Sequence, residues 1–123
     1  MKKRKNFYCE ICGMALSDGG ALTCIGNDFG FNQVFKRQLE AVGRECDVLL
    51  ALSTSGNSEN VVVAAEYARR AGILVVAITG KGGRLRDHAD VLIEIPHSGD
   101  SGRVQEITIV VIHILVNLIE RGI

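Results

Sequence analysis

Apolar and polar positions alternate in blocks along the second half of the chain. Three short apolar runs, rich in Val, Ile and Leu, are each closed by Ser, Gly or Pro, which predicts buried strands at 47–53, 73–80 and 90–96. Apolar positions with helical spacing, followed by glycine, predict helices at 58–72 and 103–122. The stretch between the second and third strands is expected to be a loop with one helical turn.

The first half of the chain gives weaker signals. Residues 30–43 predict another helix that ends at Gly43 and has one apolar face. That face consists of Phe31, Val34, Phe35, Leu39 and Val42. The stretches 13–17 and 21–27 are interpreted as short strands, whereas residues 1–13 show no clear pattern.

The order of strands and helices predicts the architecture. Strands that alternate with helices imply parallel pairing and a sheet covered on both faces, so the sequence predicts an α/β fold. A length of 123 residues suits one small domain, expected at 14–123 after an N-terminal segment at 1–13. Hydrophobic residues make up 47% of the chain and aromatic ones 5%, which agrees with a sheet core of branched aliphatic side chains.

Charge and hydropathy argue against several kinds of partner. The formal net charge is zero, and the basic run at 2–5 is interpreted as a solvated tail. No apolar segment follows this basic start, so a secretory signal is not expected. The apolar stretch of the last helix is interrupted by Thr108, His113 and Asn117, and it is judged too short to cross a bilayer. We therefore expect a cytoplasmic protein that binds neither nucleic acid nor membrane.

Four cysteines are present, and two of them form a C-x-x-C motif, Cys9 and Cys12. A zinc knuckle needs a second pair of ligands, which the spacing of Cys24 and Cys46 does not supply. We expect ordinary reduced cysteines rather than a metal or redox site.

The segment STSGNS, Ser53–Ser58, joins the first strand to the following helix. In an open α/β sheet, ligands bind beyond the carboxyl ends of the strands, where a helix N-terminus offers free N–H groups and partial positive charge. Small hydroxyl side chains and Gly56 suit a phosphate group at such a place. The simpler interpretation is that Ser55 or Asn57 caps the helix, although one cap needs one such residue rather than six. No G-x-x-x-x-G-K-[ST] motif is present, so this is not a Walker loop.

One segment resembles the sugar isomerase (SIS) domain, whose phosphosugar loop is a Ser/Thr-rich turn. This segment is DVLLALSTSGNSENVVVAAEYARRAG. Further motifs narrow the resemblance to the sedoheptulose 7-phosphate isomerases, also called phosphoheptose isomerases: ALTCIGNDFGFNQVFKRQLEAVGRECDVLLALSTSGNS, AITGKGG and RVQEITIVVIHILVNLIE. The resemblance runs from about Met14 to the C-terminus. It implies a three-layer α/β/α sandwich with a parallel sheet of SIS-type, Rossmann-like topology. The family's N-terminal helices and first strand are expected to be missing.

The resemblance also implies an activity and its residues. The family interconverts sedoheptulose 7-phosphate and D-glycero-D-manno-heptose 7-phosphate through an enediol(ate), a step in heptose biosynthesis for lipopolysaccharide. The implied phosphate-binding residues are Ser53, Thr54, Ser55 and Ser58. Asp28 and Gln105 are implied to contact the sugar, and Gln105 and His113 to serve a zinc site and the acid–base step. The resemblance further implies a homotetramer.

Helical geometry is consistent with the last pair, because residues eight apart differ by only about 80° around a helix axis. His113 nevertheless has a second interpretation, as a core or interface histidine. The helix 103–122 is apolar almost all round, which predicts that it is buried in an oligomer.

Two other functions stay open. One is a non-catalytic sugar-phosphate-binding module that acts as a regulator or assembly partner. The less favoured one is a nucleotide-binding Rossmann-like domain, since no G-x-G-x-x-G follows a strand.

Overall fold

The structure, a computed structural model, describes residues 12–97 and 99–122. Helices and strands alternate along most of this range, as the sequence predicts. In chain order, the elements are α1 (Gly19–Phe29), η1 (Phe31–Gln33), α2 (Val34–Val42), β1 (Val48–Ser53), α3 (Glu59–Arg70), β2 (Leu74–Thr79), η2 (Arg84–His88), β3 (Val91–Glu94) and α4 (Ser101–Arg121).

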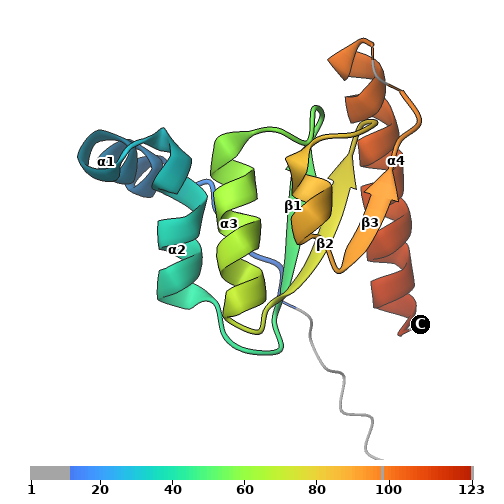
Figure 1. Ribbon diagram of the computed structural model, residues 1–123. Helices are drawn as coiled ribbons and strands as arrows, with labels where there is room; N and C mark the ends of the chain where they lie inside the picture. Colours follow the sequence, from blue (N-terminus) through green and yellow to red (C-terminus); the bar gives the residue numbers. More distant parts are fainter. Residues whose placement is uncertain (1–11, 98, 123) are drawn as a thin grey trace, which may run out of the picture.

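The three strands form one parallel sheet in the order β1-β2-β3. Helices α2 and α3 lie on one side of the sheet and α4 on the other, which makes three layers (Figure 1). The predicted α/β fold with a parallel sheet is therefore confirmed. Its parallel register matters for the site, because Ser53 of β1 pairs with Thr79, which in turn pairs with Glu94 of β3. All three strands thus end at the same edge of the sheet.

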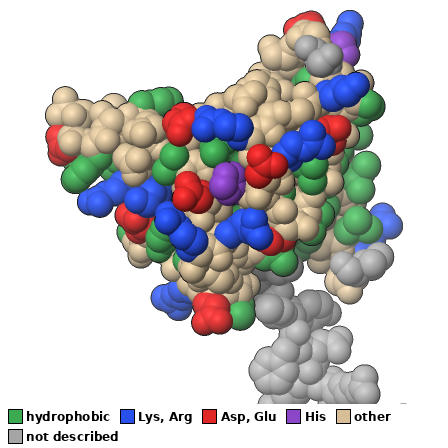
Figure 2. All heavy atoms as spheres, viewed as in Figure 1, with side chains coloured by type: hydrophobic (Ala, Val, Ile, Leu, Met, Phe, Trp, Pro, Cys, Tyr) green, Lys and Arg blue, Asp and Glu red, His purple; other side chains and the backbone are tan. Residues whose placement is uncertain are grey.

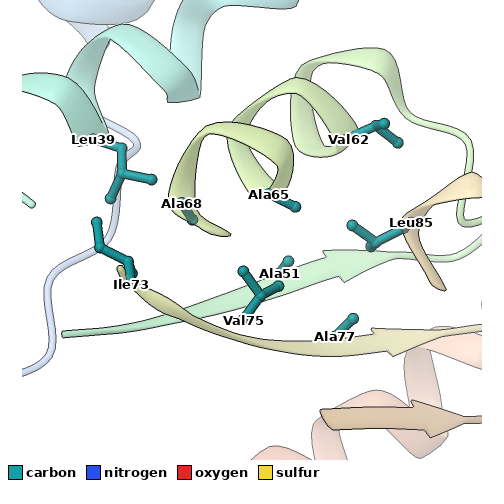
Figure 3. Packing of buried hydrophobic residues seen from close by; sticks show 9 residues of the cluster. All are labelled: Leu39, Ala51, Val62, Ala65, Ala68, Ile73, Val75, Ala77 and Leu85. Atoms are coloured by element: carbon teal, nitrogen blue, oxygen red, sulfur yellow. The ribbon is translucent and has the colours of Figure 1, made fainter. Parts of the chain in front are cut away.

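The main core lies between the sheet and α3, and small side chains make it tight. Ala65 and Ala68 of α3 are fully buried against Val75 and Ala77 of β2, so the helix backbone can approach the strands closely (Figure 3). A second, smaller cluster on the other face of the sheet is formed by Ile78, Ile95 and Val104, the last from α4. Alternate residues of β2 therefore serve two cores, as the strand period of two requires.

Helix α1 corrects one prediction, because residues 21–27 are helical and not a short strand. Asp18 caps the helix, since its Oδ1 accepts the backbone N–H of Ala21 at 2.8 Å. Its partly buried apolar residues are Ala21, Leu22 and Ile25, which is helical spacing rather than strand alternation. The segment 13–17 is also not a strand, and within the described residues no strand pairs with it.

Burial on the α4 side of the sheet is lower than the sequence predicts. Val48, Leu50 and Leu52 of β1 are 62%, 41% and 40% exposed, although their run was expected to be a buried strand. Helix α4 packs on β2 and leaves this face of β1 open. Hydrophobic side chains also show along the right-hand edge of the molecule, where α4 lies (Figure 2).

Helix α4 is mostly exposed in the single chain, and its predicted burial in an oligomer stays a prediction. Of its residues only Val104 is buried, because the sheet can cover only one face of a helix. By length and composition alone α4 could cross a membrane, contrary to the sequence-based expectation. The helix ends as predicted at Gly122, whose φ of 71° is left-handed.

Two predictions concern residues outside the described ranges, namely the basic run at 2–5 and Cys9. The three cysteines that the structure does describe, Cys12, Cys24 and Cys46, are free and exposed.

Candidate functional site

The loop between β1 and α3 is built as a turn of small polar residues. The N–H of Gly56 donates to the carbonyl oxygen of Ser53 at 3.2 Å, and the Ser55 hydroxyl accepts the N–H of Asn57 at 3.1 Å. The N-cap of α3 is Ser58, and no side-chain hydrogen bond caps the helix there. The simple capping role considered for Ser55 or Asn57 is therefore wrong.

A second loop, residues 80–84, packs directly against the first. The N–H of Gly80 donates to the carbonyl oxygen of Thr54 at 3.1 Å, and the N–H of Arg84 donates to Oδ1 of Asn57, also at 3.1 Å. Arg84 additionally forms an ion pair with Glu59 at the start of α3. The shape of the STSGNS turn therefore depends on the loop after β2.

Two glycines make this contact possible. At Gly56, with a φ of 66°, an added Cβ would lie 2.6 Å from the carbonyl oxygen of Gly82. At Gly83, with a φ of 89°, it would lie 2.4 Å from the carbonyl oxygen of Ser55. Gly56 thus serves the approach of the neighbouring loop, whereas the sequence suggested only the approach of a ligand.

A cavity of about 240 Å³ lies at the carboxyl edge of the sheet. Its lining comes from the loops that follow all three strands and from the first turn of α4. The lining residues are Thr54, Ser55, Lys81, His97, Gly99, Ser101 and Val104. Hydroxyl groups, the cationic side chain of Lys81 and the ring of His97 surround the space, and this lining includes no carboxylate. Such an arrangement suits an anion.

Two of the four predicted phosphate-binding residues, Thr54 and Ser55, line the cavity. The other two, Ser53 and Ser58, share a hydrogen bond between their hydroxyl oxygens at 2.9 Å and are absent from the lining. They tie the two ends of the loop together, because Ser53 ends β1 and Ser58 precedes α3.

Lys81 and His97 are site residues that the sequence reasoning did not find. Both follow strands of a parallel sheet, so their loops meet the STSGNS turn at one edge. That position after predicted strands was the available signal. The signal was incomplete, since the two loops also contain several other polar residues that do not line the cavity.

The remaining predicted residues lie elsewhere. Asp28 is exposed on α1, where its Oδ1 accepts the side-chain N–H of the neighbouring Asn27 at 2.8 Å. Gln105 and His113 are exposed on α4. Helices α1 and α4 lie at opposite ends of the layered arrangement, with α2, α3 and the sheet between them (Figure 1). A single chain therefore does not bring Asp28 together with Gln105 and His113.

Comparison with protein families gives a match to the SIS domain over residues 10–80, which include the STSGNS turn and end at Gly80, the first residue of the second loop. The chain belongs to the SIS domain family.

Relatives of this SIS domain are phosphoheptose isomerases. Those of Escherichia coli strain K12 / DH10B and Shigella boydii serotype 18 are each 55% identical over 109 residues, 88% of this chain. The chain spans 57% of the length of these curated relatives. Two solved phosphoheptose isomerases share the fold. The one from Neisseria gonorrhoeae has a TM-score of 0.85 at 43% identity, and the match covers 89% of this chain and 63% of that one. The one from Francisella tularensis has a TM-score of 0.83 at 36% identity, with 88% and 61% covered.

The described part of this SIS domain does not gather a metal site from its own side chains. Among residues 12–97 and 99–122, no group of three or more His, Cys, Asp or Glu side chains is placed to hold a metal ion. Among these described residues, His113 therefore belongs to no group of three or more such side chains. Zinc usually takes four ligands in structural sites and at least three protein ligands in catalytic ones.

Proposed function

We propose that this SIS domain binds the phosphate group of a sugar phosphate in the cavity beside the STSGNS turn. The observation that carries the proposal is the cavity itself, lined by Thr54 and Ser55 at the carboxyl edge of a parallel sheet. Hydroxyl groups and a helix N-terminus are typical partners of a phosphate. The match to phosphoheptose isomerases names the ligand class, with sedoheptulose 7-phosphate as the proposed substrate.

We further propose that the chain serves a phosphoheptose isomerase activity. Interconversion of an aldose and a ketose needs a base that removes a proton next to the carbonyl group and an acid that stabilises the enediolate. The proposed acid–base residue is His113, with Gln105 on the same helix and Asp28 as contacts to the sugar. A non-catalytic sugar-phosphate-binding module is the less favoured function, because the similarity to isomerases covers 88% of the chain.

The proposed activity requires more than one chain. Asp28 lies on α1 and His113 on α4, at opposite ends of the molecule (Figure 1). Exposed apolar residues of α4, such as Ile109 at 54% and Val110 at 57%, indicate that another surface covers this helix. We propose a homo-oligomer, a tetramer by resemblance to the family, in which copies of the chain join these residues in one site.

Zinc fits this proposal only in such an assembly. The family resemblance implies that Gln105 and His113 hold the ion, but two donors are too few for zinc. The described residues of one chain contain no group of three or more His, Cys, Asp or Glu side chains placed to hold a metal ion. Further donors would have to come from outside them, and none of the chemistry proposed above passes through the metal.

We also propose a cytoplasmic protein whose helix α4 meets protein rather than lipid. One face of α4 already packs on the sheet domain through Val104, with Val111, Ile112 and Leu115 beside it. Thr108, His113 and Asn117 interrupt its apolar surface. A helix held against a folded domain in this way is better suited to an interface between chains.

Thermal unfolding tests the proposed binding. With sedoheptulose 7-phosphate at about 100 times its dissociation constant, we expect the folded state to be stabilised by roughly 2.7 kcal/mol. Inorganic phosphate at the same concentration is the control for a general anion effect. An unfolding transition that does not respond to the sugar phosphate would contradict the proposal.

Turnover is tested with two substitutions. Ser55→Ala should weaken binding of the sugar phosphate, whereas His113→Ala should abolish isomerisation and leave that binding nearly unchanged. Binding without any turnover by the unaltered chain would favour the non-catalytic module. Equal loss of binding in both variants would assign His113 a structural role instead.

A further inference from the structure

We propose that Lys81 provides the positive charge that recognises the phosphate group in the cavity. The inference rests on the proposed function, since it concerns how the same cavity selects a phosphate monoester. The STSGNS turn has no cation of its own, so the charge must come from elsewhere if the site supplies one.

The backbone holds Lys81 at the edge of the cavity. The N–H of Lys81 donates to the carbonyl oxygen of His97 at 3.2 Å, and the preceding residue, Gly80, donates to the carbonyl oxygen of Thr54 at 3.1 Å. These bonds continue the pairing of the three strands past their ends. The backbone at Lys81 is therefore held by hydrogen bonds to both neighbouring loops. This lowers the entropic cost of ordering the Lys81 side chain around a ligand.

Neighbouring cations are engaged and Lys81 is not. Arg84 pairs with Glu59, and Arg86 pairs with Glu94 at 3.4 Å. Within the described part of the chain, Lys81 takes part in no ion pair, and it is the lysine in the cavity lining. Its ammonium group is thus available to a ligand.

His97 closes the turn that leads into α4. Its Nε2 accepts the backbone N–H of Asp100 at 3.1 Å, which leaves Nδ1 as the ring nitrogen that carries the proton. The Asp100 carboxylate is used at the start of the helix, where Oδ1 accepts the N–H of Gly102 at 2.9 Å. Asp100 is not in the cavity lining, and its carboxylate caps α4.

The size of the cavity agrees with recognition of the phosphate end alone. Its volume of about 240 Å³ is below the ~300–1,000 Å³ that is usual for drug-sized ligands. A phosphate group and the adjoining carbon atoms suit this space, and the rest of a seven-carbon sugar would extend out of it. Lys81 then selects the phosphorylated end of the ligand.

Calorimetric titration with sedoheptulose 7-phosphate at low salt tests the inference. We expect Lys81→Gln to weaken binding about tenfold, which is ~1.4 kcal/mol, because a charge-assisted hydrogen bond is lost. Lys81→Arg, which keeps the charge, should bind within about threefold of the unaltered chain. The deficit of Lys81→Gln should shrink as salt is added, since exposed charges are screened. A merely structural role for Lys81 would give a deficit that salt does not change.

Lys36→Gln is the matched control. It removes the same charge from α2, where Lys36 pairs with Glu40 at 3.3 Å outside the cavity lining, and it should leave binding unchanged. If Lys81→Gln binds normally while Ser55→Ala does not, Lys81 has no such role and the proposed function still holds. If the unaltered chain binds neither sedoheptulose 7-phosphate nor inorganic phosphate, the proposed function and this inference both fail. Equal weakening by Lys36→Gln and Lys81→Gln also overturns the inference, because it reports net charge alone.

Discussion

Gly83 shows how a single missing side chain can shape the site. Its φ of 89° and ψ of 160° lie in a region that is almost restricted to glycine, and an added Cβ would lie 2.4 Å from the carbonyl oxygen of Ser55. Gly82 has a similar φ of 87° but no atom within 4 Å of an added Cβ. Substitutions at Gly82 and Gly83 therefore distinguish the cost of backbone strain from the cost of steric contact between the loops.

We expect Gly83→Ala to lower the free energy of unfolding by about 3 kcal/mol, from strain plus a clash with backbone. Gly82→Ala should lower it by about 1 kcal/mol, from strain alone. Urea denaturation of both variants measures the difference. Equal losses would mean that the two loops do not need to touch. Gly83→Ala should also reduce binding of the sugar phosphate, because it displaces Ser55.

At this scale, the sequence predicted the loop but only part of the cavity. Thr54 and Ser55 could be found because a Ser/Thr-rich turn between a strand and a helix is a local signal. Lys81 and His97 could not be singled out, because their roles depend on the register of three strands and on hydrogen bonds between separate loops. Ser53 and Ser58 illustrate the same limit, since only the structure shows that their hydroxyl groups bond to each other.

Among the elements, α4 attaches to the sheet through one buried side chain, Val104, and through the partly buried Val111, Ile112 and Leu115. Val104 is 3% exposed and packs with Ile78 and Ile95 on the α4 side of the sheet. Val104→Ala removes two methyl groups and leaves a cavity, so we expect the free energy of unfolding to fall by about 2 kcal/mol. Val42→Ala, the same change at a residue that is 46% exposed on α2, should cost under about 0.5 kcal/mol.

Chemical denaturation at one protein concentration measures both variants. Similar losses in Val104→Ala and Val42→Ala would show that α4 contributes little to the stability of the sheet domain. The comparison does not depend on whether the chain is an oligomer, because Val104 is buried within one chain.

The sequence predicted those helices and strands whose apolar residues follow a clear period and whose ends carry a turn residue or glycine. Strands β1, β2 and β3 and helices α3 and α4 appear close to the predicted ranges, because each has a clear apolar period and a defined end. Helix α1 was missed, since a short stretch with few apolar positions fits either a strand or a helix. The exposed face of β1 was also not predictable, because it depends on where α4 packs rather than on the strand itself.

For the whole molecule, we expect assembly through α4. Ile109→Lys places a charge where Ile109 is 54% exposed in the single chain, and burial of that charge in an interface would be unfavourable. Sedimentation velocity should show an oligomer for the unaltered chain and a smaller species for Ile109→Lys. Ala41→Lys, at an exposed position of α2, is the control and should sediment like the unaltered chain. A well-folded monomer before any substitution would refute the proposed assembly.

Such an assembly would also explain why the site residues are spread over the molecule. Asp28 and His113 lie at opposite ends of one chain, so loss of the oligomer by Ile109→Lys should remove turnover. Phosphate binding by the cavity needs only one chain and should persist. Ile109→Lys should therefore lose turnover but keep phosphate binding.

The open side of β1 has a consequence for how long the chain survives. Within the described residues, β1 pairs with β2 on one side only, and Val48, Leu50 and Leu52 present an apolar row beside the free backbone edge. An edge of this kind is a template onto which a strand from any other polypeptide can add. A partner chain, an aggregating copy, a chaperone or a protease could each bind this exposed edge. The rate of each encounter rises with the concentration of that molecule. We therefore expect the lifetime of the folded chain to depend on the rates of such encounters at this edge as well as on the stability of its core.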